Sequence, residues 1–505
     1  MKLSQLFFGF TLSLVTSCAL ALTASEDKVD HYLQFVKQHD VDALHYFLVH
    51  MPKGADLHMH HGGASLAENL INFAANDNFC INRNTFIVFT SDNCPSTDLL
   101  ENAVADQHFK EQVIDSWSMQ DFEPGKESGH DHFFNTFAKY NAICSQHHGD
   151  ILAEIMKRAA NENEQYLEIM ITADKNESGT LGAKIGWDPD FAAMRAKLLA
   201  ADEFPTILAD MTTNLNNDEA RKNTILGCQT NSSSNACKMK VRYLYQVLRE
   251  QAPEKVFAQL LAGFEAAEHD PRIVGINMVQ PEDGTISMRD YKLHMQMVGF
   301  LHALYPDVKI SLHAGELNSA LVSPEGLKFH IHDAVEVANA NRIGHGVDIA
   351  SEDNDVELMQ DMAAKHIMVE INLSSNADIL NVKGKNHPLH LYMQYGVPMA
   401  LSTDDEGVSR SNLTNEYRQL VIDHNASYEM IKTFVRNSIT YSFLPGKSLW
   451  QDYQYKTIVP ECKNDKLTSQ HLSTTCKVFL KASEKAQMQW ELEKRFVKFE
   501  NSITK

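Results

Sequence analysis

The sequence predicts an α/β fold, a closed (β/α)8 barrel, and two observations lead to it. Eight short apolar runs, mostly rich in β-branched residues, are too continuous to be half-exposed strands. Helical patterns such as FAAMRAKLLA and PEKVFAQLLAGFEAAE fall between them, and alternating strands and helices indicate a parallel sheet. Eight such units are the number that closes a TIM barrel. The expected strands are residues 55–60, 165–172, 240–248, 273–279, 308–314, 341–347, 367–373 and 397–403.

The chain begins with a segment typical of a secretory signal. Met1 and Lys2 precede a short apolar stretch that ends in small residues, and cleavage after Ala21 fits the A-x-A pattern. The stretch is too short for a good membrane-spanning helix. We therefore expect residues 1–21 to be a signal peptide, the mature protein to be secreted or periplasmic, and no stable membrane insertion after cleavage. The tetrapeptide VTSC, which ends at Cys18, leaves lipid attachment as an alternative.

The rest of the chain divides around the barrel. Amphipathic patterns before the first strand predict a helical extension over residues 22–50, with the barrel itself over 51–445. Two interruptions, near 65–130 and 173–237, are longer than a barrel requires, so we expect insertions there. The tail, residues 446–505, has a helical and polar pattern.

The charge of the chain narrows the classes of partner. Acidic residues outnumber basic ones by 66 to 45, and the formal net charge is −21. No run of basic residues offers a local exception. Nucleic-acid binding needs a basic face, so we expect no nucleic-acid partner.

Export makes the cysteine pattern informative, because exported proteins form and keep disulfides. Six cysteines form couples that are close in the sequence and lie in polar, loop-like segments, and we expect each couple to pair, although sequence alone leaves other connectivities open. Cys144 falls on the apolar side of a helical pattern, which predicts a buried free thiol. The couples are Cys80 with Cys94, Cys228 with Cys237, and Cys462 with Cys476.

Polar side chains stand at the ends of four expected strands, and barrel enzymes build their sites at the carboxyl ends of strands. In GADLHMHHGG the strand period of two places His58 and His60 on one face. The other three strands end in SLHAGE, IGHGVD and LSTDDEG. These endings contribute His313 and Glu316, then His345, and then Asp404 and Asp405.

Other histidines do not follow apolar strands, so we expect them to be solvated or structural. His61 points away from the face of His60 or into the following loop. The remaining pairs precede, end or open helices: His130 and His132, His147 and His148, and His387 and His390.

Three imidazoles and one carboxylate suit zinc, with an open position left for water. Zinc lowers the pKa of bound water to about 7 and makes hydroxide available as a nucleophile. Glu316 and His345 would supply the proton donor and the base that hydrolysis needs.

With these motifs the chain resembles the adenosine deaminase superfamily of metal-dependent amidohydrolases. More narrowly, it resembles the secreted adenosine deaminase-related growth factor branch. The segments MPKGADLHMHH, SLHAGE, RIGHGVD, VEINLSSNADIL and LSTDDEG occur in order and with strand context. The likeness covers most of residues 50–440, and the exported, disulfide-bearing insertion matches that branch.

The resemblance implies a role for each residue of the site. One zinc per chain would be bound by His58, His60, His313 and Asp404. Glu316 would protonate purine N1, which makes C6 electrophilic. His345 would orient the hydroxide and stabilise charge as it attacks C6, and Asp405 would share a hydrogen bond with the hydroxide or with purine N7. These groups act where charge develops.

Two departures from the family pattern concern the substrate. Many members carry an aspartate two residues after the HxH pair, on the substrate side, where this chain has His61 and Gly62, so His61 is a candidate for contact with the substrate. Many members also place a glycine N–H against purine N3, and Gln280 stands at that point here. HDHFFNTF resembles a segment that covers the substrate, so three phenylalanines would line the pocket, or else form a helix core: Phe133, Phe134 and Phe137.

The leading hypothesis is a deaminase that converts adenosine and 2′-deoxyadenosine to inosine and 2′-deoxyinosine with release of ammonia. One alternative keeps the hydrolysis and changes the substrate to another aminopurine or a modified nucleoside. Another is an extracellular binding or signalling protein with a vestigial site, which the complete set of site residues disfavours. In the related branch N-terminal helices mediate dimerisation, so the resemblance implies that the extension before residue 50 could support a homodimer.

Overall fold

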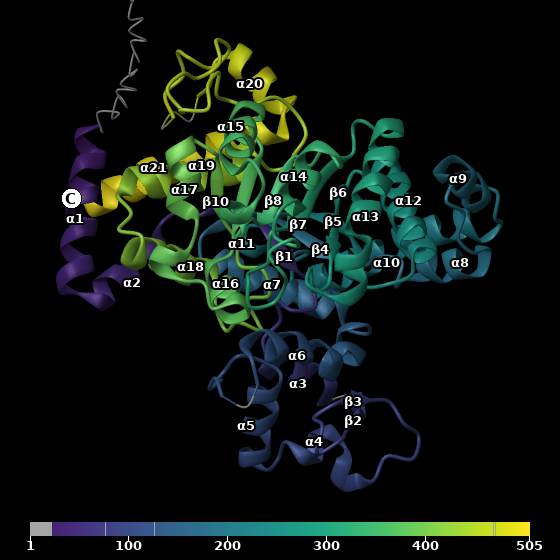
Figure 1. The fold of residues 1–505 in the computed structure, drawn as a ribbon. Coiled ribbons are helices and arrows are strands. Elements are labelled where there is room, and N and C mark those ends of the chain that lie inside the picture. Colours follow the sequence, from purple (N-terminus) through teal and green to yellow (C-terminus); the bar gives the residue numbers. More distant parts are fainter. Residues whose placement is uncertain (1–22, 76, 126, 468, 470, 505) are drawn as a thin grey trace, which may run out of the picture.

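The computed structural model describes residues 23–75, 77–125, 127–467, 469 and 471–504. It confirms the barrel: eight parallel strands follow one another in the order β1-β4-β5-β6-β7-β8-β9-β10 (Figure 1). Hydrogen bonds from His60 N to Asp404 O (3.2 Å) and from Asp404 N to His58 O (2.8 Å) join the first strand to the end of the last. The strands are β1 (Gly54–His60), β4 (Glu164–Ile171), β5 (Lys240–Leu248), β6 (Ile273–Val279), β7 (Lys309–Ala314), β8 (Arg342–His345), β9 (Met368–Ile371) and β10 (Met399–Leu401).

Two of the four strands that carry the site, β8 and β10, end earlier than the sequence predicts, whereas β1 and β7 end at the predicted residues. β8 stops at His345, whose φ is 67°, and the segment after β10 turns at Asp404, whose φ is 61°. A left-handed backbone cannot continue a strand, so the chain leaves the sheet at these side chains. The polar residues therefore stand on the rim of the barrel.

Helices surround the barrel as expected from the alternating pattern. α12 shows why they form: Pro253 occupies its first position, where no backbone N–H is lost, and its apolar residues are buried against the sheet. The barrel helices are α7 (His148–Asn161), α12 (Pro253–His269), α13 (Thr285–Leu304), α14 (His330–Glu336), α15 (Asp355–Lys365), α16 (Leu373–Leu380), α17 (Leu389–Tyr395), α18 (Leu413–Asp423) and α19 (Tyr428–Thr440), with short 3₁₀ turns η2 (Ile349–Ser351) and η3 (Gly384–Asn386).

The predicted signal peptide, including Cys18, lies outside the described residues. The extension that follows it forms two helices, α1 (Ala24–His39) and α2 (Val41–His50). Thr23 and Glu26 cap α1 reciprocally, and Asp40 caps α2. Both helices pack on the chain's own barrel helices and on α21, and the C-terminus lies beside α1 (Figure 1).

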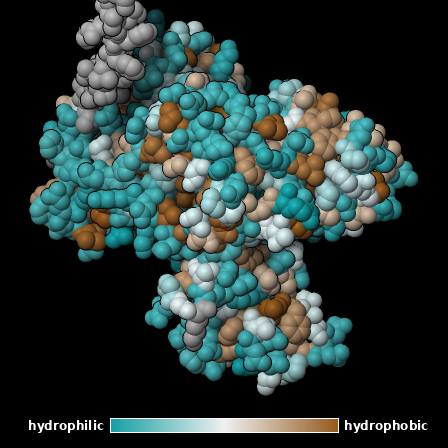
Figure 2. Space-filling model, in the orientation of Figure 1, coloured by the Kyte–Doolittle hydropathy of each residue, from teal (hydrophilic) through white to brown (hydrophobic). Residues whose placement is uncertain are grey.

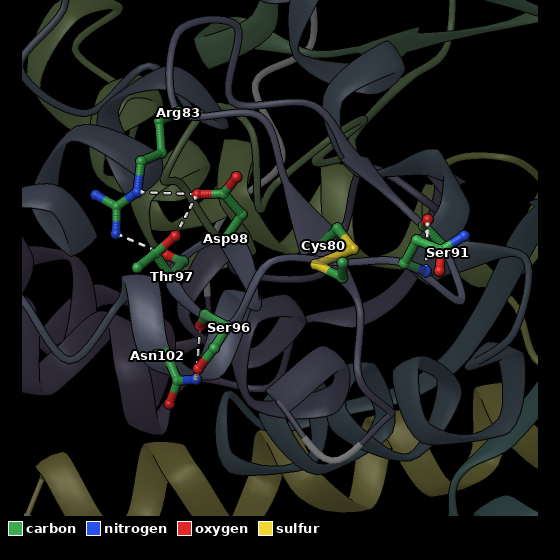
Figure 3. Close-up of a disulfide and its surroundings, with 9 residues drawn as sticks. Cys80, Arg83, Ser91, Ser96, Thr97, Asp98 and Asn102 are labelled. Carbon is green, nitrogen blue, oxygen red and sulfur yellow. Dashed lines mark hydrogen bonds and ion pairs between the residues drawn. A yellow bond between two sulfur atoms is a disulfide. The ribbon is translucent and has the colours of Figure 1, made fainter.

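The first long interruption forms a lobe that projects from one end of the barrel (Figure 1). The Cys80–Cys94 disulfide joins β2 to the loop after β3, beside an Arg83–Asp98 ion pair with Nε and Oδ1 3.5 Å apart (Figure 3). α6 lies between the lobe and the barrel. The elements are α3 (Ala67–Ala75), β2 (Cys80–Ile81), β3 (Val88–Phe89), η1 (Ser96–Asp98), α4 (Leu100–Ala103), α5 (Gln107–Ser116) and α6 (Gly129–Cys144).

The second interruption is helical and ends in the Cys228–Cys237 disulfide. Its long α10 packs on α7 and α12. The elements are α8 (Glu177–Ile185), α9 (Phe191–Leu199), α10 (Glu203–Ile225) and α11 (Asn235–Lys238).

The C-terminal tail forms two helices and buries apolar side chains. α20 (Thr474–Lys481) and α21 (Glu484–Ile503) follow a loop closed by the Cys462–Cys476 disulfide. One face of α21 is apolar and buried, including Leu492 and Phe496. Gln165, near the start of β4, donates from Nε2 to Met488 O at 2.8 Å, so α21 covers the amino end of the barrel.

The visible surface is mainly hydrophilic, with hydrophobic residues scattered over it (Figure 2). Within the described part of the chain, no helix combines the length and apolar character that crossing a membrane requires.

Peptide mapping under non-reducing conditions is expected to find the three local disulfides and a free Cys144. Burial raises the pKa of the Cys144 thiol to about 12, so little thiolate is present at neutral pH. Cys144 should therefore resist alkylation in the native protein and react after unfolding in denaturant. A disulfide that contains Cys144 in freshly purified protein would contradict this pairing.

Candidate metal and catalytic site

The predicted metal ligands converge at the carboxyl end of the barrel. The Nε2 atom of His313 lies 3.1 Å from Nε2 of His58 and 3.2 Å from Nε2 of His60. Asp404 Oδ1 lies 3.6 Å from His58 Nε2 and 3.2 Å from His60 Nε2. His345 is a fifth neighbour, with Nε2 3.8 Å from Asp404 Oδ2. The four predicted ligands thus surround one point.

Each ligand imidazole is held through its Nδ1 atom, so that Nε2 faces the shared point. His58 Nδ1 lies 2.6 Å from a Glu370 carboxylate oxygen, and His313 Nδ1 lies 2.8 Å from Asn277 Oδ1. The Nδ1 atom of His60 lies 3.3 Å from Gln246 Oε1. An oxygen at Nδ1 fixes the tautomer in which Nε2 is a free lone pair.

This donor arrangement fits a cation. Three imidazole nitrogens and a carboxylate, nearly all buried, face one another, and neutral nitrogen lone pairs this close repel unless a proton or a metal lies between them. His58, His313, His345 and Asp404 have one ligand atom each within 4.8 Å of one another, as do His60, Asp404 and Asp405.

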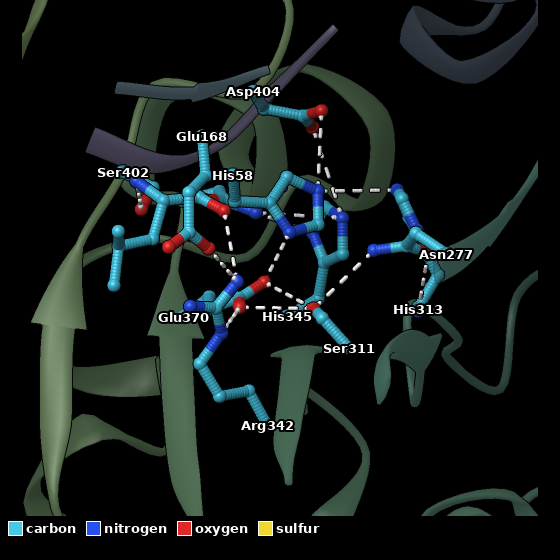
Figure 4. A network of polar contacts seen from close by, with 12 residues as sticks. His58, Glu168, Asn277, Ser311, His313, Arg342, His345, Glu370, Ser402 and Asp404 are labelled. Atoms are coloured by element: carbon cyan, nitrogen blue, oxygen red, sulfur yellow. Dashed lines mark hydrogen bonds and ion pairs between the residues drawn. The ribbon is translucent and has the colours of Figure 1, made fainter. Parts of the chain in front are cut away.

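A buried charge network under the site was not predicted from the sequence (Figure 4). Arg342 on β8 pairs with Glu168 on β4 at 2.7 Å and with Glu370 on β9 at 2.6 Å, and all three side chains are fully buried. Ser311 Oγ donates to Glu370 at 2.9 Å. The available signal was a charged residue inside each of three apolar strands, because such residues are rarely buried without partners.

Close approach explains one glycine of the RIGHGVD segment. A side chain at Gly344 would come within 2.6 Å of the His58 ring, so only glycine leaves room for that imidazole.

Glu316 and His345 lie beside the cluster, with Glu316 Oε1 3.6 Å from His345 Nδ1. Burial, and then the Asp404 and Glu282 carboxylates, raise the pKa of Glu316 well above its usual value, which favours the protonated acid. Burial lowers the pKa of His345 to about 4, so its imidazole is neutral at pH 7. The site therefore holds an acid and a base side by side, which hydrolysis requires.

Asp405 follows Asp404 directly in the sequence, and its side chain is also buried. Burial raises its pKa to about 7, and no described residue hydrogen-bonds its Oδ1 atom. A side chain at Gly63 would overlap this carboxylate. The unpartnered oxygen of Asp405 is available to a water or a ligand.

His61 does not join the cluster. Its Nε2 atom donates to the carbonyl of His148 at 2.9 Å, and burial lowers the pKa of His61 to about 3. The strand period turns it away from His60, as the sequence indicated. The prediction that His147 and His148 end a helix is wrong, since His148 begins α7 and His147 precedes it.

The other rival histidines have partners outside the cluster. His130 and His132 lie in the first turn of α6. His130 Nε2 lies 3.0 Å from an Asp283 carboxylate oxygen, and His132 Nδ1 lies 3.0 Å from Glu127. The contact from His130 to Asp283 holds α6 against the loop after β6.

Gln280 lies in that loop with a φ of 81°, a left-handed conformation that glycine adopts without strain. Its side-chain Oε1 accepts from Glu250 N at 2.8 Å, and its carbonyl accepts from Arg249 at 2.9 Å. The side chain is thus held by Glu250.

The three phenylalanines of α6 differ in burial. Phe133 is 1% exposed and belongs to the core, with its ring centroid 5.4 Å from that of Phe134 and 5.9 Å from that of Phe137. Phe134 and Phe137 are half-buried and pack on the same core. For Phe133 the structure favours the helix-core alternative over pocket lining.

Comparison with known proteins now identifies the family. The sequence model described as adenosine deaminase matches residues 107–450. The chain belongs to the adenosine deaminase family. This family is metal-dependent, and the His/Asp cluster is where its metal would bind.

Curated relatives within the family are similar over part of their length. The adenosine deaminase of Clostridium acetobutylicum is 34% identical over 137 residues, which cover 27% of this chain and 38% of that protein. The adenosine deaminase of Shewanella loihica is 26% identical over 306 residues, 58% of this chain and 76% of that protein. The chain spans 38% of the length of the Clostridium acetobutylicum protein and 44% of the length of the adenosine deaminase of Shewanella woodyi, which is less than half of each.

Solved structures of deaminases share the fold. Adenine deaminase from Arthrobacter aurescens has a TM-score of 0.50 at 17% identity, covering 78% of this chain and 94% of that chain. The Arabidopsis N6-mAMP deaminase has a TM-score of 0.51 at 19% identity, covering 79% and 96%. At sequence identities this low, the similarity shows a shared barrel fold and nothing further.

Proposed function

We propose that this protein is a zinc-dependent deaminase of adenosine and 2′-deoxyadenosine. The observation that carries the proposal is the convergence of His58, His60, His313 and Asp404 beside the buried acid Glu316. Histidine and carboxylate ligands that leave a position open for water are typical of catalytic zinc sites. The vestigial-site alternative does not account for an acid and a base kept beside a complete ligand set.

The residues of the site account for the steps of a hydrolytic deamination. Zinc, when bound, would supply a Lewis acid that activates water near neutral pH. Protonated Glu316 donates to purine N1, which draws electron density from C6. Neutral His345 takes a proton from the attacking water as the C6–O bond forms, and it passes this proton to the amino group as the C6–N6 bond breaks and ammonia leaves. The remaining hydroxyl proton returns to Glu316, which restores the acid and leaves the C6 carbonyl of the product. The unpartnered oxygen of Asp405 shares a hydrogen bond with the attacking water or with purine N7, and this bond orients the water or the purine.

The substrate class follows from what surrounds the site. Relatives are named adenosine deaminase, whereas two similar folds are named adenine deaminase and N6-mAMP deaminase. The chain has neither a Gly-rich phosphate loop nor an arginine cluster, and its net charge is −21, which disfavours phosphorylated substrates. We therefore rank adenosine and 2′-deoxyadenosine above AMP, and free adenine low because it lacks ribose contacts.

A panel of kcat/KM values over adenosine, 2′-deoxyadenosine, AMP, adenine and N6-methyl analogues tests this ranking. Loss of the ultraviolet absorbance of adenosine is the first measurement. If AMP or free adenine comes out on top, the nucleoside assignment fails while the hydrolytic mechanism stands.

Gln280→Gly is expected to change KM more than kcat, because the residue contacts bound purine through its N–H and does not touch the reacting carbon. Glycine relieves the left-handed backbone but removes the bond to Glu250 N. An unpaired purine N3 would cost about 1–3 kcal/mol, so the backbone donor is expected to stay in place. Steady-state kinetics on adenosine check this, and a selective loss of kcat would contradict it.

We further propose that the chain is exported and belongs to the secreted growth factor branch. Support comes from the signal-like residues 1–21 and from the disulfide-bearing lobe. Exposed Phe35 and Tyr46 on α1 and α2 support a homodimer through these helices. Amino-terminal sequencing of protein collected outside the cytoplasm should begin at Leu22, and a retained residue 1 would contradict export by cleavage.

A further inference from the structure

The loop after β6, residues 280–284, lies directly behind the acid of the site. Its Glu282 is 1% exposed and accepts hydrogen bonds from Gly315 N at 3.0 Å, from Glu316 N at 2.9 Å and from His330 Nδ1 at 2.5 Å. These donors come from the end of β7 and from the first residue of α14. One carboxylate from the loop after β6 therefore ties that barrel unit to the next one, β7 and α14, at the backbone of Glu316.

We infer that Glu282 is a positioning residue for the acid: it fixes the direction in which the Glu316 side chain leaves the end of β7. The inference rests on the proposed function, because it assumes that Glu316 donates a proton to the substrate. Glu282 itself touches the backbone of Glu316 and acts through it.

Glu282 stabilises a turn that contains Gly315, a residue with an unusual backbone conformation. Gly315 has a φ of 78°, and a side chain there would meet Asp348 Oδ1 at 2.5 Å and the Ile331 side chain at 2.8 Å. Glycine fits this crowded left-handed position, but it is also the residue with the greatest backbone freedom. The N–H groups of Gly315 and Glu316 both donate to this one carboxylate, and these two bonds fix the peptide groups on both sides of Gly315.

The carboxylate is in turn fixed by its own surroundings. The His330 ring, which donates to Glu282, stacks on Tyr291 with centroids 3.7 Å apart, and Tyr291 Oη donates to His330 O at 2.7 Å. Burial opposes ionisation of Glu282, but its bonds from His330 and the backbone outweigh burial and lower its pKa to about 2. Glu282 is therefore an ionised acceptor throughout the pH range of assay.

Glu352 provides a matched control. It is also buried, at 5% exposure, and accepts a backbone N–H, from Ile331 at 2.5 Å. Its hydrogen bond goes to α14 and not to the turn of Glu316. Burial raises the pKa of Glu352 to about 8, so it is mainly protonated at pH 7, and glutamine mimics that form. Glu352→Gln should keep wild-type kinetics.

The experiment measures kcat, KM, metal content and thermal stability for wild type, Glu282→Gln, Glu352→Gln, Glu316→Gln and the 282/316 double variant. In Glu282→Gln the amide NH2 replaces one acceptor and faces a backbone N–H, so the turn shifts. Misplacement by about 1 Å costs on the order of 10² in rate, and we expect that loss in kcat. KM and metal content should change less than about threefold, since binding groups are untouched. If Glu282→Gln does not fold, Glu282→Asp keeps the charge on a shorter arm and should show a smaller loss of kcat.

The double variant separates positioning from general stability. If Glu282 acts through Glu316, the substitution at 282 causes no further loss of kcat once Glu316 is glutamine. A second loss of equal size in that background, or unchanged kcat in Glu282→Gln, overturns the inference. Failure of the wild type to turn over any aminopurine overturns the proposed function instead, and with it the role of Glu316. Active wild type with an unaffected Glu282 variant overturns the inference alone.

Discussion

His58→Ala is expected to lose both the bound metal and the deaminase activity. His58 is fully buried, its Nε2 faces the other ligands, and its Nδ1 is held by Glu370 at 2.6 Å. Changing a residue that holds a metal ligand in place typically costs about 10–100-fold in metal affinity or activity, so removing a ligand itself should cost more. Elemental analysis after dialysis should find about one zinc per wild-type chain and none in the variant.

His130→Ala is the matched control, because His130 is a histidine with a carboxylate partner, Asp283 at 3.0 Å, but stands outside the cluster. It should keep the metal. Zinc loss in His130→Ala with zinc retained in His58→Ala would overturn the ligand assignment.

Glu316→Gln is expected to keep the metal and bind nucleoside, yet turn over at least about 10²-fold more slowly. Glutamine preserves the shape of the side chain but has no acidic proton for purine N1, and general acid catalysis is typically worth about 10²–10⁴-fold. Glutamine keeps the size of the side chain and offers an N–H donor, so nucleoside binding should be affected little. Single-turnover kinetics with a binding titration separate the two effects.

Near-normal turnover by Glu316→Gln would exclude Glu316 as the acid. A parallel loss of metal would instead show that Glu316 supports the cluster, beside which its Oε1 atom lies 3.6 Å from His345 Nδ1. Metal content can be measured in the same preparation.

Two local rules predict which residues lie on the rim of the barrel. Local periodicity decides which side chains share a face of a strand, and in a closed parallel barrel all carboxyl ends meet at one edge. These two rules were enough to bring His58, His60, His313, His345 and Asp404 together, and they also turned His61 away. Local spacing likewise predicted the disulfide couples, because each pair lies within 14 residues.

The contacts that hold those residues in place come from distant parts of the chain and could not be predicted from local patterns. His58 and Glu370 are 312 residues apart, and Arg342 joins strands β4 and β9 from β8. Glu282 lies in the loop segment VQPEDG, and nothing in that segment indicates a partner. Its contact with the backbone of Glu316 depends on how the turns after β6 and β7 meet. α21 lies against the amino end of the barrel and buries apolar side chains within a tail whose sequence is mainly polar. Contacts of this kind depend on the closure of the barrel, because residues far apart in the chain leave no common period in the sequence.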